Sequence, residues 1–335
     1  MTARSFESRV GHALYAGRRW HPAELAFWLL AFAAFVLLPS QLLLLNEIAI
    51  LALFALSLDL ILGYAGIVSL GHAAFLGMGA YAAGLFAKHV GGDPVAGLLA
   101  GMSAGAMLGL LTSSLVLRGS DLTRLMITLG VALIVYELAN SLGWLTGGAD
   151  GLQGVAMGPV LGLFDFDIFG RTAYLYSLSV LFVLFLVARR VVHSPFGLSL
   201  RAIRDNPLRA AASGVPNARR LAAAYTLAAA YAGAAGALLA QTTQFVSLDV
   251  LDFHRSADLM LVLIIGGAGY LYGGLVGAIV FKLLQDAIAS FTPQYWMFWI
   301  GLFLVLFVLG GREIIHGVVK GVAGRLSAVR KGAVR

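Results

Sequence analysis

Apolar runs long enough to cross a membrane follow one another along almost the whole chain. A helix of about 20 apolar residues spans the hydrocarbon core of a bilayer, where the backbone must satisfy its own hydrogen bonds. The runs lie at residues 24–44, 46–64, 68–87, 95–117, 125–145, 172–189, 220–241, 256–267, 272–290 and 294–310. The sequence therefore predicts an all-α, multi-pass integral membrane protein with about ten transmembrane segments, or eight if one pair fails to cross.

The composition excludes several other classes of protein. Only 12% of the residues are charged, against about 25% in ordinary soluble domains. The chain has no cysteine, so disulfides, thiol catalysis and thiolate metal sites are excluded. We find no metal-binding motif and no set of side chains suited to catalysis. The net charge of +7 lies in short loops and end segments, so we expect no nucleic acid partner.

The placement of the basic residues predicts the orientation in the membrane. Arginine and lysine concentrate in the N-terminal segment 1–22, in the loop 190–219 and in the tail 312–335. Loops rich in these residues stay in the cytoplasm. Both termini are therefore expected to be cytoplasmic, and residues 23–311 are expected to form one transmembrane domain between two basic cytoplasmic segments.

Glycines interrupt two of the apolar regions. Residues 60–84 contain six glycines, and each glycine costs about 1 kcal/mol relative to alanine inside a helix. Loosened backbone is tolerated at membrane depth only where protein buries it or where it lines a watery cavity. We therefore predict broken or half-helices near 63–84 and 256–278, which is typical of a route for a solute.

The candidate pathway residues come from these two glycine-rich regions. Gly71 would let the backbone approach the route, and Ser69 or His72 could hydrogen-bond a solute. The alternative is structural, with the hydroxyl bonded to its own helix and the imidazole to a neighbouring helix. Asp59 has the same two interpretations, an unusual polar role or a bond that anchors a helix. The full set is Asp59, Gly63, Gly66, Ser69, Gly71, His72, Tyr81, Gly266, Gly267 and Gly269.

The basic loop 190–219 is predicted to contain two short amphipathic helices. The first would begin after Ser194, with proline in its first turn, and end at Asn206, because the residue before a proline avoids the α region. The second would end at Gly214. Such a pair forms a compact docking element, whereas a basic loop lying on anionic membrane lipid is the alternative.

A separate spacing predicts close helix packing. Gly101, Gly105 and Gly109 form two overlapping GxxxG steps, which let two helix backbones approach closely in a membrane. The seam could lie inside the chain or against another subunit.

Four stretches carry a family resemblance. They are GYAGIVSLGHAAFLGMGAY (63–81), TGGADGLQGV (146–155), SPFGLSLRAIRDNPLRAAASGV (194–215) and GGAGYLYGGLVGA (266–278). On these motifs the chain resembles the permease subunits of branched-chain amino acid ABC importers, of the LivM type. The resemblance implies a multi-pass protein of a bacterial inner membrane, with a LivH-like second permease, two cytosolic ATPase subunits and a periplasmic solute-binding protein as partners.

The resemblance also implies that residues 194–215 hold a coupling helix received by a groove of an ATPase. The chain has no G-x-x-x-x-G-K-[ST] motif, so a nucleotide site must come from another subunit. We accordingly expect no enzyme activity and no cofactor on this chain, with ATP-Mg bound by the ATPases. The residues assigned to coupling are Pro195, Phe196, Arg201, Ala202, Ile203, Arg204, Asp205, Asn206, Pro207, Arg209, Ala210 and Gly214.

Other functions remain open at this point. Relatives of this general type are associated with branched-chain amino acids and also with urea, amides and aromatic acids, so the solute is not fixed. An ion-coupled carrier would need Asp59 or Glu137 as part of a cation site. A membrane-embedded enzyme would need a nucleophile or a metal set that we do not find, and a purely structural subunit is a further alternative.

Overall fold

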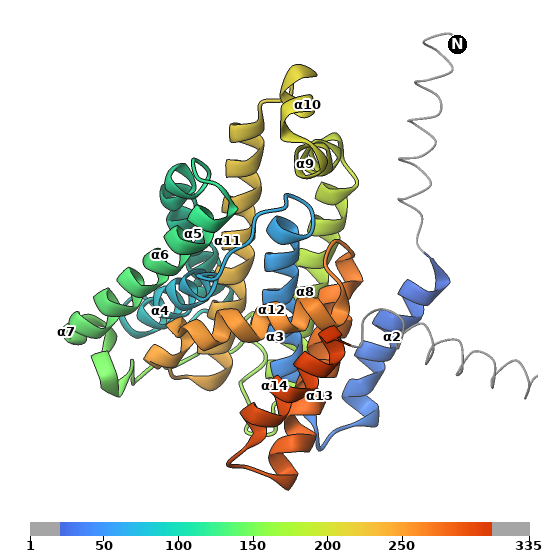
Figure 1. Cartoon of the computed structure of the whole chain (residues 1–335). Coiled ribbons are helices and arrows are strands. Elements are labelled where there is room, and N and C mark those ends of the chain that lie inside the picture. The colour runs from blue at the N-terminus through green and yellow to red at the C-terminus, as the bar shows by residue number, and fades with distance from the viewer. Residues whose placement is uncertain (1–20, 310–335) are drawn as a thin grey trace, which may run out of the picture. The chain divides into compact units, whose positions relative to one another are not determined.

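The computed structural model describes residues 21–309, and its regular elements in that range are helices joined by irregular segments (Figure 1). The elements are α2 (Pro22–Leu37), α3 (Leu42–Leu62), α4 (Ala73–His89), α5 (Pro94–Val116), α6 (Asp121–Ser141), α7 (Gly143–Thr146), η1 (Gly148–Asp150), α8 (Arg171–Val192), α9 (Pro195–Asp205), α10 (Pro207–Ala212), α11 (Asn217–Thr243), η2 (Leu248–Leu251), α12 (Phe253–Gly266), α13 (Leu271–Phe291) and α14 (Trp296–Leu309). The all-α class is therefore confirmed for the described residues.

Each of the ten predicted apolar runs overlaps one main helix. Six helices are long and apolar enough to cross a membrane, namely α3, α5, α6, α8, α11 and α13. The helices of the other four runs are shorter, from 14 residues in α12 and α14 to 17 in α4. A multi-pass membrane protein is therefore supported, whereas the number of ten crossings and the cytoplasmic location of the termini stay predictions.

Some helix boundaries differ from the predicted runs for local reasons. The run 24–44 is not one helix, because α2 ends at Leu37, just before Pro39, and α3 begins at Leu42. The residue before a proline avoids the α region. The run 68–87 becomes helical only at Ala73, where α4 begins.

The chain divides into two compact units, Met1–Val280 and Phe281–Arg335. The described part of the second unit comprises the end of α13 and α14. Residues 1–20 of the basic N-terminal segment and the whole tail 312–335 lie outside the described residues. The single transmembrane domain at 23–311 stays a prediction.

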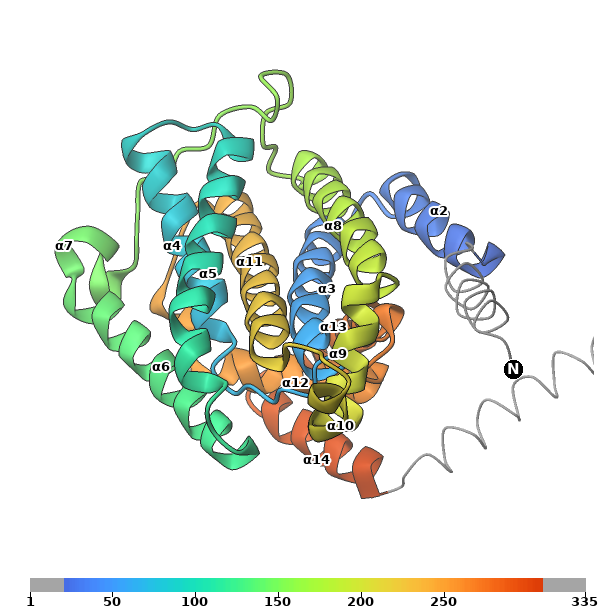
Figure 2. The same ribbon diagram turned by 90° about the horizontal axis from the view of Figure 1, so that it is seen from above.

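Within the first unit, α3 and α11 form the centre. Figure 2 shows them between α5 on one side and α8 on the other, and both helices are mostly buried. Alanine and glycine dominate the buried face of α11, so its neighbours α4 and α5 can come close to its backbone. This central packing positions the two breaks described below.

The predicted GxxxG seam is confirmed, and it lies inside the chain. A Cβ added at Gly105 of α5 would lie 2.5 Å from the carbonyl oxygen of Ala229 in α11, and one at Gly101 would lie 2.7 Å from the Cβ of Ala237. Gly109 also faces Ala229. Side chains at these positions would therefore push α5 away from α11.

Both predicted helix breaks are present. Residues 63–72 separate α3 from α4, and residues 267–270 separate α12 from α13. The φ angles of Gly66, Gly267 and Gly269 are +72°, +86° and +87°, values that side chains with a Cβ rarely tolerate. The breaks are narrower than the predicted regions, because residues 73–84 continue as regular α4.

Candidate functional site

The elbow, residues 194–215, folds as the sequence predicts. Helix α9 begins at Pro195, and the chain turns at Asn206 before Pro207 begins α10 (Figure 1). The Asn206 side chain accepts a hydrogen bond of 2.9 Å from the amide of Arg209, which caps the first turn of α10. Gly214, with a φ of +82°, follows the end of α10. The elbow is therefore held by local contacts of its own.

The elbow has an inward face and an outward face. Leu200 and Ile203 of α9 and Ala210 of α10 are buried against the rest of the unit. The outward face includes the exposed residues Pro195, Ala202, Asp205, Asn206, Pro207, Arg209 and Gly214. Leu208, which the sequence assignment omitted, is 83% exposed at this surface.

Two arginines of the elbow point inward, to the break after α3. The guanidinium Nη1 of Arg204 donates a hydrogen bond to the carbonyl oxygen of Gly63. The Arg201 guanidinium carbon lies 5.1 Å from the centre of the Tyr64 ring, a cation–π contact. Arg204 also pairs with its neighbour Asp205 at 3.2 Å. The charged groups of α9 therefore bind other residues of the same chain.

Asp59 joins the two breaks to each other. Its carboxylate oxygen Oδ1 accepts a hydrogen bond of 2.6 Å from the amide of Gly269, and its side chain is completely buried. A Cβ at Gly63 would collide with this oxygen and with the Gly269 amide, so only glycine fits at this position. We call Asp59, Gly63, Gly66, Gly269 and Arg204 the break junction.

Gly66 completes the break junction on the side of the elbow. A Cβ at Gly66 would lie 2.7 Å from Cγ of Arg204. The glycine therefore serves two purposes, because it adopts a positive φ and leaves room for the arginine stem. The second carboxylate oxygen of Asp59, Oδ2, is one of several buried acceptors without a hydrogen-bond partner among residues 21–309.

His72 is held by a neighbouring helix. Its Nε2 lies 2.8 Å from Oγ of Ser57 in α3, and the Ser57 hydroxyl donates to the carbonyl oxygen of Phe54 at 2.5 Å. Because that hydroxyl has one proton, we assign the donated hydrogen to Nε2 of His72. This is the structural arrangement that the sequence analysis left open, and a role in solute binding stays a prediction.

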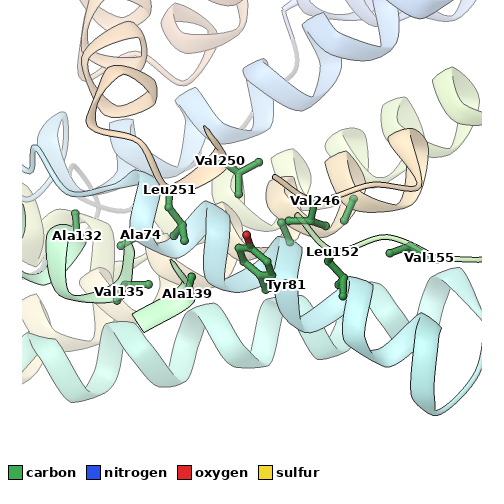
Figure 3. Packing of buried hydrophobic residues seen from close by; sticks show 12 residues of the cluster. Ala74, Tyr81, Ala132, Val135, Ala139, Leu152, Val155, Val246, Val250 and Leu251 are labelled. Atoms are coloured by element: carbon green, nitrogen blue, oxygen red, sulfur yellow. The ribbon is translucent and has the colours of Figure 1, made fainter. Parts of the chain in front are cut away.

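The other pathway residues do not gather at the junction. Gly71 packs against the backbone of Thr128 in α6, and Gly266 packs against Gly273 of α13. Ser69 is buried, and its hydroxyl has no partner among the described residues. Figure 3 shows the ring of Tyr81 among aliphatic side chains, including Val250, Val246 and Leu152. Ser69, Gly71 and Tyr81 are buried and Gly266 is half-buried, and these positions belong to separate contacts.

Sequence reasoning missed two contacts near the breaks. The hydroxyl oxygen of Ser256 in α12 accepts a hydrogen bond of 2.9 Å from the amide of Ala73, the first residue of α4. Tyr64 receives Arg201, as described above. No local pattern marks either residue, because each partner lies far away along the chain.

The family model described as "Branched-chain amino acid transport system / permease component" matches residues 41–308. These residues include every member of the break junction and the whole elbow. The match therefore covers most of the first unit, about half of the second and the whole candidate site.

Individual relatives agree with this family. The high-affinity branched-chain amino acid transport system permease protein LivM of Escherichia coli K12 is 28% identical over 283 residues, which cover 77% of this chain and 65% of LivM. The probable branched-chain amino acid transport permease protein LivH of Methanocaldococcus jannaschii is 25% identical over 257 residues, covering 73% and 79%.

A sugar transport protein is also similar. The fructose import permease protein FrcC of Rhizobium meliloti is 27% identical over 277 residues, covering 79% of this chain and 76% of FrcC. The chain thus spans 65% of the length of LivM and a larger share of the other two relatives. No solved structure matches the chain significantly.

Proposed function

Because this chain belongs to the family of branched-chain amino acid transport permease components, we propose that it forms, with a second LivH-like permease, the path for these amino acids through a bacterial inner membrane. A periplasmic binding protein delivers the solute, and two cytosolic ATPases that bind ATP-Mg supply the energy. The chain itself catalyses no reaction in this scheme. Its task is to switch the path between states open to the two sides.

The contact between the elbow and both breaks is the observation that carries this proposal. Arg204 binds the carbonyl of Gly63, and Asp59 binds the amide of Gly269. A displacement of α9 therefore acts on the break after α3 and, through Asp59, on the break before α13. Broken helices are typical of the solute routes of transporters, so this chain of contacts suits the coupling of a motor to a route.

The solute is expected to be selected mainly by the binding protein. The junction offers one buried carboxylate oxygen without a partner, Oδ2 of Asp59, and few other polar groups converge on it. Such a route gives little discrimination between solutes. The second candidate function is a permease of the same kind of importer that carries a different solute. The similarity to a fructose import permease is the observation that favours this alternative.

The proposal is tested in two steps. The cognate binding protein should bind leucine, isoleucine or valine more tightly than fructose or urea, as measured by calorimetry. The complete assembly in proteoliposomes should then import the bound amino acid only when ATP is present on the elbow side. An assembly with a hydrolysis-deficient ATPase is the control. If the binding protein fails to bind these amino acids, the assignment of the solute is wrong. If the assembly fails to import with ATP, the proposed function is wrong.

A further inference from the structure

A cavity of about 720 Å³ lies on the first unit, away from the break junction. Residues of α5 and α8 form most of its lining, together with Phe35 of α2 and residues of the turn 160–164. Figure 2 shows the segment before α8 running past the ends of α4 and α5 to reach that helix. The turn is well defined, because the amide of Val160 donates to the carbonyl of Phe164 at 2.8 Å and the reverse bond is 3.2 Å.

The cavity wall is apolar in the parts that belong to the helices. Leu98, Met102, Val180 and Val183 are among its lining residues. The polar groups nearby are already used, since the Ser179 hydroxyl donates to the carbonyl of Leu175 at 2.7 Å. The helical walls therefore offer few polar groups for an amino acid or a sugar, and an apolar molecule suits them better.

One cation stands at the end of the cavity. Arg171, the first residue of α8, lines the cavity and is exposed. Its guanidinium carbon lies 6.0 Å from the centre of the Phe169 ring, and among residues 21–309 no carboxylate forms an ion pair with it. The site therefore combines a long apolar slot with a cation available for an anion.

The surroundings of Arg171 favour the boundary between lipid tails and water. Leu161, Leu163, Ile168 and Phe169 are between 72% and 92% exposed. An apolar loop of this kind next to the end of a membrane-length helix suits the level of lipid headgroups. Arginine at this depth pairs well with phosphate, because its planar guanidinium donates two parallel hydrogen bonds.

We propose that this cavity binds one acyl chain of a glycerophospholipid whose phosphate pairs with Arg171. A helix from another subunit is a poor occupant by size. With side chains a helix is about 10 Å across and rises 5.4 Å per turn, so a cavity of this volume would hold only roughly two turns. A lipid tail is thin enough to fill the slot along its length while the headgroup stays at its end.

The test uses phosphatidylglycerol with a photoreactive group in its acyl chain, added to the full-length chain in phosphatidylcholine nanodiscs. After irradiation, mass spectrometry should locate the label on cavity residues such as Met102 and Val183. Met107 and Leu111 of α5 are 62% and 65% exposed but do not line the cavity. Equal labelling of these two positions would show that the lipid contacts the chain without a site.

Two matched pairs of variants separate the slot from the cation. Val183→Trp fills the cavity and should reduce labelling at least about fivefold, whereas Val187→Trp, four residues along the same exposed face of α8, should not. Arg171→Gln should weaken phosphatidylglycerol retention about tenfold, whereas Arg190→Gln, near the other end of α8, should not. Unchanged labelling and retention in Val183→Trp and Arg171→Gln would overturn the proposal.

The complete importer provides the last measurement. The cavity residues should be labelled equally in this chain alone and in the assembly with its partners. Labelling that is lost in the assembly would mean that a partner subunit covers the cavity, and this would also overturn the proposal. Because the readout is lipid labelling, a failure here would leave the proposed transport function untouched.

Discussion

Replacement of Arg204 by Gln is expected to weaken the link between the elbow and the route. The variant loses the charged donor to the carbonyl of Gly63. Hydrogen bonds to charged groups contribute about 1.5–3 kcal/mol. The Arg204 side chain is 39% exposed, so solvent screening puts the loss at about 1.5 kcal/mol, the lower end of that range. If the coupling free energy between the elbow and the route falls by this amount, the coupling between ATP hydrolysis and import should fall about tenfold.

The measurement is the number of solute molecules imported per ATP hydrolysed by the complete assembly in proteoliposomes. For Arg204→Gln this ratio should fall about tenfold, while membrane insertion, assembly and ATP hydrolysis are retained. Reversal of the charge, in Arg201→Glu and Arg204→Glu, should also uncouple uptake without preventing insertion. In these variants, ATP hydrolysis should no longer respond normally to solute.

A matched control removes the same charge elsewhere in the same loop. Arg219 is exposed in the first turn of α11, and no hydrogen bond or ion pair of its guanidinium is found among residues 21–309. Arg219→Gln should therefore leave the ratio unchanged. An unchanged ratio in Arg204→Gln would refute the reasoning, and so would an equal loss in both variants, because the effect would then come from loop charge alone.

Two further predictions concern packing and pH. Gly105→Leu should lower the thermal stability of the purified chain in detergent, because α5 must move away from Ala229 of α11. Gly130→Ala, where a Cβ meets open space, should not lower it. Equal melting temperatures of the two variants would contradict the close packing of α5 on α11. At the start of α12, the hydrogen bond that Nδ1 of His254 donates to Oδ1 of Asp252 at 2.8 Å raises the pKa of His254 above its ordinary 6.5. The stabilising effect of the pair is thus present below about pH 6.5 and is lost as the pH rises through the pKa of His254 in the folded chain. An NMR titration should show this pKa moving back down in Asp252→Asn, and an unchanged value would exclude the pair as its cause.

The sequence by itself determined the helices, the breaks and the elbow, because these features depend on neighbours a few residues away. Apolar runs of membrane length must be helical. Glycine tolerates a positive φ, and Gly66, Gly267 and Gly269 adopt one at the two breaks. Pro195 and Asn206 set the ends of α9 by the same kind of local constraint. The resemblance read from four short motifs also led to the family that the comparisons show.

Only the tertiary structure decided which of these features meet. Asp59 bonds to an amide 210 positions away, and Arg204 bonds to a carbonyl 141 positions away. The family resemblance assigned Arg201 and Arg204 to the ATPase-coupling loop, which stays a prediction, and only the structure shows that their guanidinium groups contact Tyr64 and Gly63 of the same chain. It likewise left open whether the glycine seam of α5 was internal, and packing on α11 places it inside.

The physical reason lies in the uniformity of membrane helices. In lipid, apolar residues surround a helix on all sides and do not mark the face that packs against protein, since lipid tails are as apolar as leucine. Partners of a buried carboxylate or guanidinium are therefore fixed by how closely the backbones approach. That approach is set by all the helices of the unit together, so no single segment of the sequence encodes it.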